Sequence, residues 1–326
     1  MPIAVFGSIA TDHLMHFPGR FAEQLVEEHL DRISLSFLVD DLTVHKGGSG
    51  ANIAFGLGVL GRSPLLVGAV GTDFAEYREW LEAHGVDCSA VLVCEGVHTA
   101  RFVCTTDDDM RQIGSFYSGA MARSGQITLA SLSERDVELV LVGATDPDAM
   151  VSMSSQCREA GMPFVADASQ QVARMHGPEI RSLIHGARFL MTHDYEWELV
   201  QQKTGWTEAQ VAEQVEIRVT TLGEHGVHIV ARDGGEVAEL KVGVVPETGR
   251  VDPTGVGDAF RAGFLAATTG GLPLERAAQL GCLVTVQVLE TEGAQEWKWD
   301  RDIALERLRD AYGPDAAAEI GPLLPG

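Results

Sequence analysis

The amino-acid sequence predicts an α/β fold with a mostly parallel central sheet and helices on both of its faces. Short apolar runs typical of buried strands alternate with helical periodicity through the middle of the chain, which is the pattern of consecutive βαβ units. The 326 residues, 45% of them hydrophobic, are enough for one large α/β domain or two smaller ones with a substantial core.

The chain begins with a predicted buried strand at residues 3–6, which ends at Gly7 and Ser8. Further strands are expected at residues 64–70, 137–142, 164–166, 189–191 and 219–222. Helical spacing predicts helices at residues 50–60, 74–84, 148–160 and 301–312. Two stretches joined by Arg232-Asp233-Gly234-Gly235 are typical of an edge hairpin, and a loosely held tail is expected from Gly313.

Two strand-rich segments interrupt this alternation. The first contains a predicted strand at residues 34–39 and, after a turn at Asp40 and Asp41, an extended stretch at residues 42–45. The second runs from residue 99 to 117, and Asp107-Asp108-Asp109 is expected to form its turn. Both segments are therefore expected to lie outside the alternating βαβ part.

One glycine-rich turn, Asp252-Pro253-Thr254-Gly255-Val256-Gly257-Asp258, precedes a helical pattern that starts at Ala259. Glycines before a helix let successive backbone N–H groups point outward, and the helix N-terminus adds partial positive charge. Such a turn suits a phosphoryl group, and Asp258 is well placed to take a proton from a hydroxyl. The alternative from these residues alone is an N-capped helix with a flexible approach.

A second glycine-rich turn, His45-Lys46-Gly47-Gly48-Ser49-Gly50-Ala51-Asn52, also leads into a helix. Gly48 would let a ligand lie against bare backbone, and Asn52 can both donate and accept hydrogen bonds. The letters GxGxxG also occur at residues 56–61. We reject a dinucleotide site there, because no strand leads into these glycines and they fall late in a helix.

These two turns, in this order and far apart, resemble the paired motifs of the pfkB (ribokinase-like) family of small-molecule kinases. The similarity extends from Val5 to Trp297 and is close to the bacterial adenosine kinases of that family. It implies a ribokinase-like fold in a single domain, residues 1–326, with lid segments 12–45 and 98–118 inserted within it. It also implies ATP-dependent phosphorylation of the adenosine 5′-hydroxyl to AMP, a reaction of purine salvage, with Asp258 as the base.

The resemblance also implies the residues that bind the acceptor. Asp12 would grip the ribose hydroxyls at the mouth of the first strand, and Phe102 and Phe116 would stack on the purine, although lid core explains these two aromatic residues equally well. The implied substrate-binding residues are Ser8, Asp12, Gly48, Asn52, Phe102, Phe116, Gln170 and Gln171.

The nucleotide and ion sites follow from the same resemblance. The amides of Gly255, Val256 and Gly257 would neutralise developing charge, and the implied ATP-binding residues are Arg174, Thr221, Gly223 and Gly257. Glu196 would hold Mg²⁺ through water, although His193 stands where the family usually has Asn. Asp252, with Thr254 and carbonyls near Gly293 and Ala294, would form a site for a monovalent cation such as K⁺.

Charge and cysteine content narrow the expected partners and location. The net charge of −23 argues against nucleic acid and anionic membranes, and with four lysines phosphate binding should rest on backbone amides, a metal and a few arginines. Five cysteines without a CxxC pair, no signal-peptide start and no membrane-length apolar run predict a cytoplasmic protein. We expect a homodimer formed through the lid, with Phe37 reaching the partner's site.

Two alternatives stay open at this stage. A pfkB-type sugar kinase, similar to ribokinase, fructokinase or phosphofructokinase, would need no aromatic stacking. A non-catalytic nucleoside-binding regulator would have no need of Asp258 as a base. P-loop and protein-kinase motifs are missing from the sequence, which excludes those kinase classes.

Overall fold

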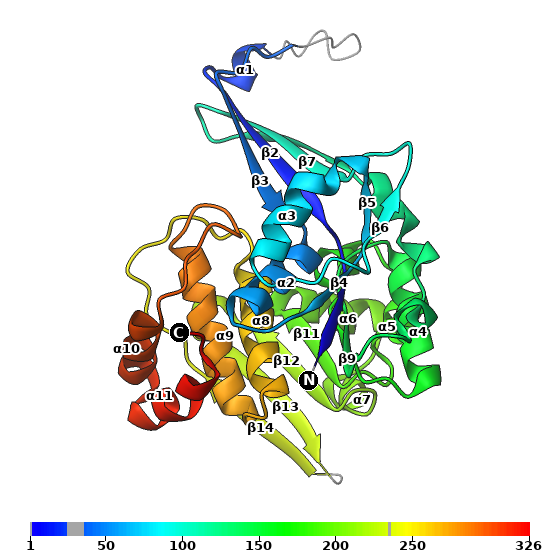
Figure 1. The fold of residues 1–326 in the computed structure, drawn as a ribbon, viewed down its shortest axis with the longest axis vertical. Helices are drawn as coiled ribbons and strands as arrows, with labels where there is room; N and C mark the ends of the chain where they lie inside the picture. The colour runs from blue at the N-terminus through cyan, green and yellow to red at the C-terminus, as the bar shows by residue number, and fades with distance from the viewer. Residues whose placement is uncertain (1, 25–35, 234–235) are drawn as a thin grey trace.

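The computed structural model describes residues 2–24, 36–233 and 236–326. In Figure 1 a body built around one large sheet carries a smaller sheet that projects from it. This arrangement confirms the predicted α/β fold with a separate small β-sheet. In the described part of the chain, no helix has both the length and the apolarity needed to cross a membrane.

The central sheet has eight strands in the order β14-β13-β12-β11-β10-β9-β1-β4. Strands β4, β1, β9, β10, β11 and β12 are parallel to one another. Strands β13 and β14 form an antiparallel hairpin at one edge, as predicted. The bounds are β1 Ile3–Phe6, β4 Leu65–Val67, β9 Leu139–Val142, β10 Phe164–Ala166, β11 Phe189–His193, β12 Ile217–Thr221, β13 Val227–Asp233 and β14 Glu236–Val242.

Helices cover both faces of this sheet because its strands are apolar on both sides. Along β1, Val5 packs into one core with α2, α8 and α9, and Phe6 packs into the other with α4, α5 and α6. The bounds are α2 Ser49–Val59, α4 Pro147–Ala160, α5 Gly177–Ile184, α6 Asp194–Thr204, α8 Val256–Thr269 and α9 Leu274–Leu289. The remaining helices are α1 Phe21–Gln24, α3 Ala75–Ala83, α7 Glu208–Ala212, α10 Arg301–Tyr312 and α11 Pro314–Ile320.

The smaller sheet, which we call the lid, has four strands in the order β3-β2-β7-β8. Its strands are β2 Ala10–Phe17, β3 Asp41–Gly47, β7 Ala100–Asp107 and β8 Gln112–Tyr117. The turn between β7 and β8 forms where predicted, because the buried Asp107 carboxylate accepts hydrogen bonds from the backbone N–H groups of Asp109 and Arg111. The two segments that interrupt the βαβ pattern thus supply β3, β7 and β8 of the lid.

Three local predictions are wrong, and one lid strand was not predicted. Of the strand predicted at 34–39, residues 34 and 35 lie outside the described residues, and residues 36–39 form no strand. Phe37 instead packs against Phe17 and Phe21, with ring centroids 5.0 and 4.9 Å apart. The lid strand β2 was not predicted, because its alternation is hidden by polar residues.

The predicted strand at 64–70 is two strands, β4 and β5 (Ala69–Gly71), because the chain leaves the central sheet at Gly68 and β5 pairs with β6 (Leu92–Cys94). The tail predicted from Gly313 is helix α11, which buries Ala316, Ala317 and Ile320.

Candidate active site

A cavity of about 790 Å³ lies between the lid and the ends of the central strands. The lid contributes Asp12, Phe102 and Phe116, while the two glycine-rich turns contribute their helix N-termini. The cavity therefore lies at the carboxyl ends of the parallel strands, where open α/β sheets bind ligands.

Nearly all predicted site residues line this cavity. They are Ser8, Asp12, Gly48, Asn52, Phe102, Phe116, Gln170, Gln171, Arg174, Glu196, Thr221, Gly223, Gly255, Val256, Gly257 and Asp258. Asp252 is absent from the lining. Its carboxylate accepts hydrogen bonds from the backbone N–H groups of Thr254 (2.8 Å) and Gly293 (3.0 Å). It therefore joins the glycine-rich turn before α8 to the loop after α9.

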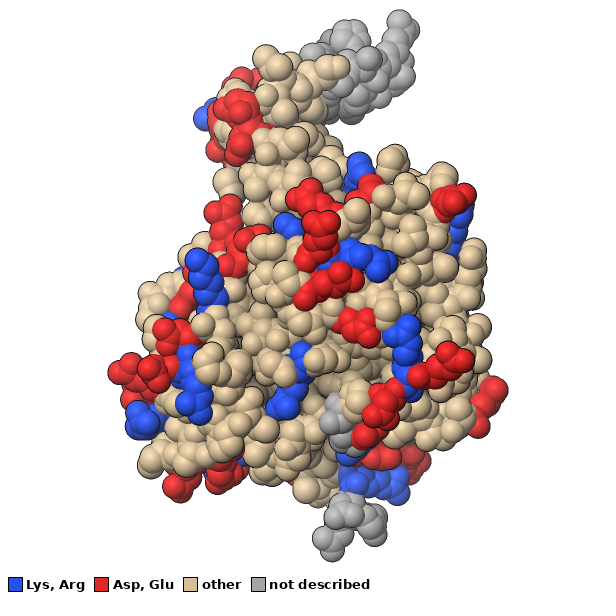
Figure 2. Space-filling view, in the orientation of Figure 1, with Lys and Arg blue, Asp and Glu red and all other residues tan. Residues whose placement is uncertain are grey.

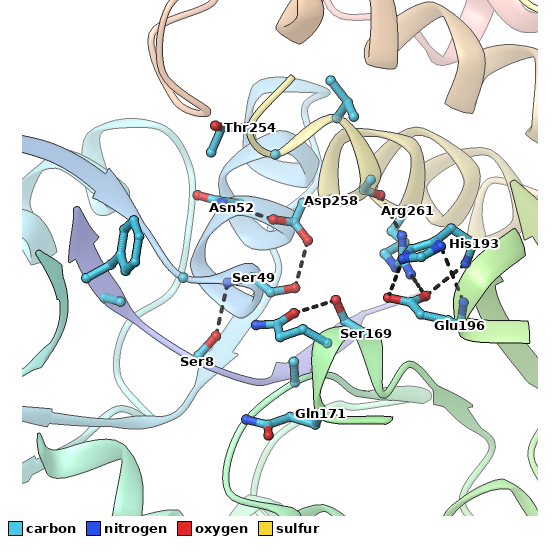
Figure 3. Close-up of a pocket in the computed structure, with 18 of the residues that line it drawn as sticks. Ser8, Ser49, Asn52, Ser169, Gln171, His193, Glu196, Thr254, Asp258 and Arg261 are labelled. Atoms are coloured by element: carbon cyan, nitrogen blue, oxygen red, sulfur yellow. Dashed lines mark hydrogen bonds and ion pairs between the residues drawn. The ribbon is translucent and has the colours of Figure 1, made fainter. Parts of the chain in front are cut away.

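Asp258 occupies the centre of the site (Figure 3). Its Oδ1 accepts a 2.7 Å hydrogen bond from Ser49 Oγ, and its Oδ2 accepts a 2.9 Å bond from Asn52 Nδ2. Desolvation raises the pKa of Asp258 to about 6, and the bonds from Asn52 and Ser49 partly offset this rise. A carboxylate with this pKa is ionised at neutral pH, and its pKa is close enough to neutral pH for it to act as a general base.

The turn before Asp258 depends on Gly255. This residue is the N-cap of α8 and has a left-handed conformation with φ 79°. A Cβ there would lie 2.5 Å from Ala294 Cβ. Within the described residues no side chain caps α8, and the N–H of Val256 donates only a long 3.4 Å bond to the Pro253 carbonyl, so the first turn of the helix can still bind an anion at the cavity. The alternative of a side-chain-capped helix is therefore excluded for this turn.

The other turn is shaped by Gly48, whose φ is 91°. A Cβ on Gly48 would lie 2.6 Å from Ala10 N and 2.7 Å from Ser8 O. The bare backbone thus lets the start of α2 pass directly beside the end of β1. Ser8 Oγ then accepts a 3.0 Å hydrogen bond from Ser49 N, which ties the two segments together.

The lid presents one aromatic and acidic face to the cavity. Asp12 on β2, Phe102 on β7 and Phe116 on β8 are consecutive cross-strand partners, so their side chains project from the same face of the lid. Burial raises the pKa of Asp12, and nearby His45 partly offsets this. Phe116 is 51% exposed, so an aromatic surface faces the cavity without a covering group.

The opposite wall comes from the segment after β10. Ser169 adopts φ 45°, a conformation that is uncommon for a residue with a side chain and that often occurs at functional sites. The next residues, Gln170 and Gln171, face the cavity, and the buried Gln171 Oε1 has no hydrogen-bond partner among the described residues. Arg174 follows at the end of this turn and is exposed.

A buried ion cluster that the sequence analysis missed supports the glycine turn. The guanidinium of Arg261 binds the buried carboxylate of Asp167 through two nitrogens and donates a 3.0 Å bond from Nη1 to the Gly257 carbonyl. Glu196 Oε2 lies 3.9 Å from Arg261 Nη2. The cluster fixes the carbonyl side of the turn, which leaves its N–H groups directed to the cavity.

Glu196 and His193 are linked at the start of α6. Glu196 Oε2 accepts a 2.8 Å bond from His193 N, and His193 Nε2 lies 3.2 Å from Glu196 Oε1. Desolvation raises the pKa of Glu196, with Arg261 opposing and Asp167 adding to the shift. In the described residues no group of three or more His, Cys, Asp and Glu side chains could hold a metal. A single buried carboxylate nevertheless fits Mg²⁺, which keeps several waters and binds phosphate oxygens.

A second cavity of about 380 Å³ adjoins the first and shares Thr221, Gly223, Val256 and Gly257 with it. Its other lining is mainly apolar and includes Val227, Val245, Phe260, Cys282, Val286 and Leu289. The glycine turn therefore stands between a polar cavity under the lid and an apolar one behind it.

The sequence analysis also missed Ser49, Tyr77 and Gln295. Ser49 lies inside the first glycine turn, so its hydroxyl could have been considered. Tyr77 on α3 and Gln295 in the loop after α9 give no local signal, because only the tertiary fold brings Gln295 into contact with both Asn52 and Tyr77.

Comparison with known proteins gives a consistent family. Residues 10–301 match the sequence profile of the pfkB family carbohydrate kinases. A nucleoside kinase of Methanocaldococcus jannaschii is 28% identical over 266 residues, which are 80% of this chain and 85% of that protein. The structure of its kinase superposes with a TM-score of 0.84 at 24% identity, covering 95% of this chain and 98% of the other.

A nucleoside kinase of Burkholderia thailandensis is similar to this chain in both sequence and structure. Its structure in complex with inosine has a TM-score of 0.80 and 32% identity, and it covers 96% of this chain and 99% of the other. A further structure of that enzyme contains ADP and inosine and has a TM-score of 0.78 at 33% identity, covering 96% of each chain.

Proposed function

The chain belongs to the pfkB family of carbohydrate kinases, and within it we propose a nucleoside kinase that phosphorylates the 5′-hydroxyl of adenosine with ATP. The observation that carries this proposal is the single cavity in which Asp258, the open N-terminus of α8 and the aromatic face of the lid meet. A base, an anion site and a purine-stacking surface together suit phosphoryl transfer to a nucleoside.

In the proposed reaction Asp258 accepts the proton of the substrate hydroxyl as its oxygen attacks the γ-phosphorus of ATP. The new O–P bond forms while the bond from the γ-phosphorus to the bridging oxygen breaks, and ADP leaves with that electron pair. The bonds from Ser49 and Asn52 hold both carboxylate oxygens, so the base is fixed before the substrate arrives.

The charge of the transferred group would be neutralised by the first amides of α8, those of Val256 and Gly257, after the turn at Gly255. Arg174 would contact the phosphates from the other wall. When bound, Mg²⁺ would neutralise phosphate oxygens, and Glu196 is the residue that would hold it through water. Asp252 keeps free lone pairs beside its two backbone bonds, so we retain it as a ligand of a monovalent cation.

The proposed position of ATP spans the boundary between the two cavities. The apolar second cavity would take the adenine of the donor, while Thr221 and Gly223 lie at the boundary between the cavities. The γ-phosphate would then reach the glycine turn, which both cavities share through Gly257. This assignment leaves the cavity beneath the lid for the acceptor.

Three observations favour a nucleoside over a free sugar in that cavity. Phe102 and Phe116 offer a flat apolar surface that a sugar does not need. Gln171 lines the cavity, and its side-chain amide can donate to or accept from a base edge, including the 6-amino group of adenine. The relatives from Methanocaldococcus and Burkholderia are named nucleoside kinases.

Inosine is the nearest rival acceptor, because the Burkholderia enzyme binds it and a glutamine amide can turn its nitrogen toward a 6-oxo group. A sugar kinase is the second candidate function, since the family profile is that of carbohydrate kinases. A non-catalytic regulator would not require a carboxylate whose pKa is about 6 beside an anion site.

We also propose that two copies pair through the outer face of the lid. Leu42, Val44 and Ile113 are about half exposed there and lie on the side opposite Asp12 and Phe102. An apolar sheet face of this kind favours self-association. Figure 2 shows acidic side chains across lid and body, interspersed with basic ones. The partners that we propose are small molecules and a second copy of this chain.

The experiment that tests the function measures ADP release with ATP, Mg²⁺ and K⁺ across a panel of acceptors. The panel contains adenosine, inosine, guanosine, cytidine, ribose and fructose 6-phosphate. We expect the highest kcat/KM with adenosine. A preference for inosine or cytidine would keep the nucleoside kinase and overturn the acceptor, and turnover on sugars alone would overturn the role of the lid. Tight adenosine binding without ADP release would favour the regulator.

A further inference from the structure

The proposed base is one end of a buried chain of hydrogen bonds that begins in the lid. Tyr77 Oη on α3 donates to the carbonyl of Gly47, the last residue of β3, at 2.9 Å. Gln295 Nε2 donates to Tyr77 Oη at 2.6 Å and to Asn52 Oδ1 at 2.8 Å. Asn52 Nδ2 then donates to Asp258 Oδ2 at 2.9 Å.

This chain is shielded from water. Gln295 is 1%, Tyr77 5% and Asn52 8% exposed. Hydrogen bonds in such surroundings are strong, and leaving one partner unpaired is costly. The chain therefore has one stable arrangement of donors and acceptors.

Its direction is fixed from the lid end. A backbone carbonyl can only accept a hydrogen bond. The Tyr77 hydroxyl must therefore donate its proton to the Gly47 carbonyl and accept a hydrogen bond from Gln295. Gln295 therefore presents its NH₂ group to both neighbours, which makes Asn52 turn its oxygen toward Gln295. The NH₂ group of Asn52 is then left to face Asp258. A flipped Asn52 would place an oxygen against the carboxylate.

This order of donors has a visible cost. Gln295 Oε1 is buried and has no hydrogen-bond partner among the described residues. A buried unpaired carbonyl destabilises a fold, so its presence calls for a reason. The reason offered by the geometry is that Gln295 must direct its only donor group, rather than its acceptor, at Asn52 and Tyr77.

We propose that Gln295 and Tyr77 are positioning residues that fix the amide orientation of Asn52 and thereby hold Asp258 ready to accept the substrate proton. This inference rests on the proposed role of Asp258 as the base. It adds two residues on separate segments, α3 and the loop after α9, and it ties the base to the root of lid strand β3.

The test compares single and double variants. Gln295→Met keeps the length of the side chain but removes the donor, and Tyr77→Phe removes only the hydroxyl. Losing the oriented bond from Asn52 removes an interaction that favours the ionised carboxylate. We expect the acidic limb of kcat/KM to move up by about 1 pH unit in Gln295→Met and by less in Tyr77→Phe. The kcat should fall about 10- to 100-fold, and the nucleoside KM should change by less than about threefold.

The double variant separates positioning from general support. In an Asn52→Ala background Gln295→Met should produce no further shift, because its effect passes through Asn52. Equal shifts in both backgrounds would overturn the proposal. So would a Gln295→Met protein that loses stability but keeps the parent pH profile. The charged groups nearest Asp258, Arg261 on α8 and Asp167 after β10, are the same in every variant.

Two controls, one at a buried glutamine and one at a half-buried tyrosine, account for the loss of polar side-chain groups outside this chain of hydrogen bonds. Gln279→Met changes a buried glutamine on α9 that binds Arg276. Tyr312→Phe removes a hydroxyl that donates to the Gly243 carbonyl. Both should leave the pH profile unchanged.

A readout without turnover keeps the inference separate from the proposed function. The pKa of Asp258 can be titrated by ¹³C NMR of protein labelled at aspartate carboxyls, with Asp258→Asn assigning the signal. If no acceptor is phosphorylated, the kinase proposal fails. The ¹³C titration then still decides whether Gln295 and Tyr77 hold the carboxylate.

Discussion

The side-chain amide of Asn52 donates a 2.9 Å hydrogen bond to the Asp258 carboxylate across a sequence separation of 206 residues. This contact joins the helices that follow the two glycine-rich turns. Each turn alone could be an ordinary loop, whereas their meeting at one carboxylate creates a base with a fixed orientation beside an open helix N-terminus.

Replacing Asp258 by Asn should lower kcat by about 10²–10⁴-fold, because a neutral amide cannot take the hydroxyl proton. The nucleoside KM should change by no more than a few fold, since the side chain keeps its size. Steady-state ADP release measures both constants. A kcat within tenfold of the parent would contradict the role of Asp258 as base. Asp194→Asn, an exposed change on the cavity rim, is a control for altered charge alone.

The pH dependence follows from the raised pKa of Asp258, which is about 6. The base works in its ionised form, so kcat/KM should be level near pH 8 and fall with unit slope below about pH 6. Because folding raises this pKa above its ordinary value of 3.8, protonation of Asp258 stabilises the folded state. This contribution to the free energy of unfolding is fully present below pH 3.8 and is lost as the pH rises through about 6. Rates between pH 5 and 8 test this limb, and it should be absent from residual Asp258→Asn activity.

Removing the aromatic face of the lid should weaken nucleoside binding more than turnover. Base stacking contributes about 1–3 kcal/mol per aromatic ring, so Phe102→Ala should raise the adenosine KM by about 5- to 150-fold. Tyr117→Ala is the matched control, because Tyr117 lies beside Phe116 on β8 but pairs with Arg101 on the other face. Equal effects of the two substitutions would argue against stacking.

The left-handed turn at Gly255 should not tolerate a side chain. Gly271 has a similar φ of 85° with open space around its Cβ position, whereas a Cβ on Gly255 would meet Ala294 at 2.5 Å. Gly271→Ala should cost about 1–2 kcal/mol from backbone strain, and Gly255→Ala should cost more and abolish turnover. Urea denaturation and ADP release measure the two effects. Similar stability and activity in both variants would contradict the close packing of this turn.

Arg261 should be essential for stability as well as for the turn. Arg261→Met leaves the buried Asp167 without its partner, a change that typically costs about 3–5 kcal/mol. Arg135→Met, which breaks an exposed pair with Asp87, should cost about 1 kcal/mol or less. Equilibrium unfolding in urea compares them, and equal losses would show that the buried cluster contributes little.

Much of the fold could be predicted because its signals are local. Strands β1, β4, β9 and β10 are continuous apolar runs, and the glycine turns carry their own conformational requirement at Gly48 and Gly255. The lid strand β2 and the helix α11 were missed for a physical reason. Polar residues such as Asp12 and His13 mask the alternation of β2, and α11 is a short helix whose apolar face is defined only by its packing.

The site could be predicted where function is carried by a motif and not where it is carried by support. Asp258, Asn52 and the glycines belong to recognisable turns. Arg261, Tyr77 and Gln295 act through contacts with residues 94, 30 and 243 positions away, which no local pattern records. The roles of Asp252 and Glu196 in ion binding stay predictions that metal-dependent kinetics can address.

The most direct test of the central claim is to identify the product formed from adenosine and ATP by proton-coupled ³¹P NMR. The account predicts one AMP for each ADP, with a phosphorus signal split by the two protons on the 5′-carbon, and AMP formation at least about 100-fold slower with Asp258→Asn. A phosphate on another hydroxyl, ADP formed without AMP, or an adenosine that stays unmodified would contradict it.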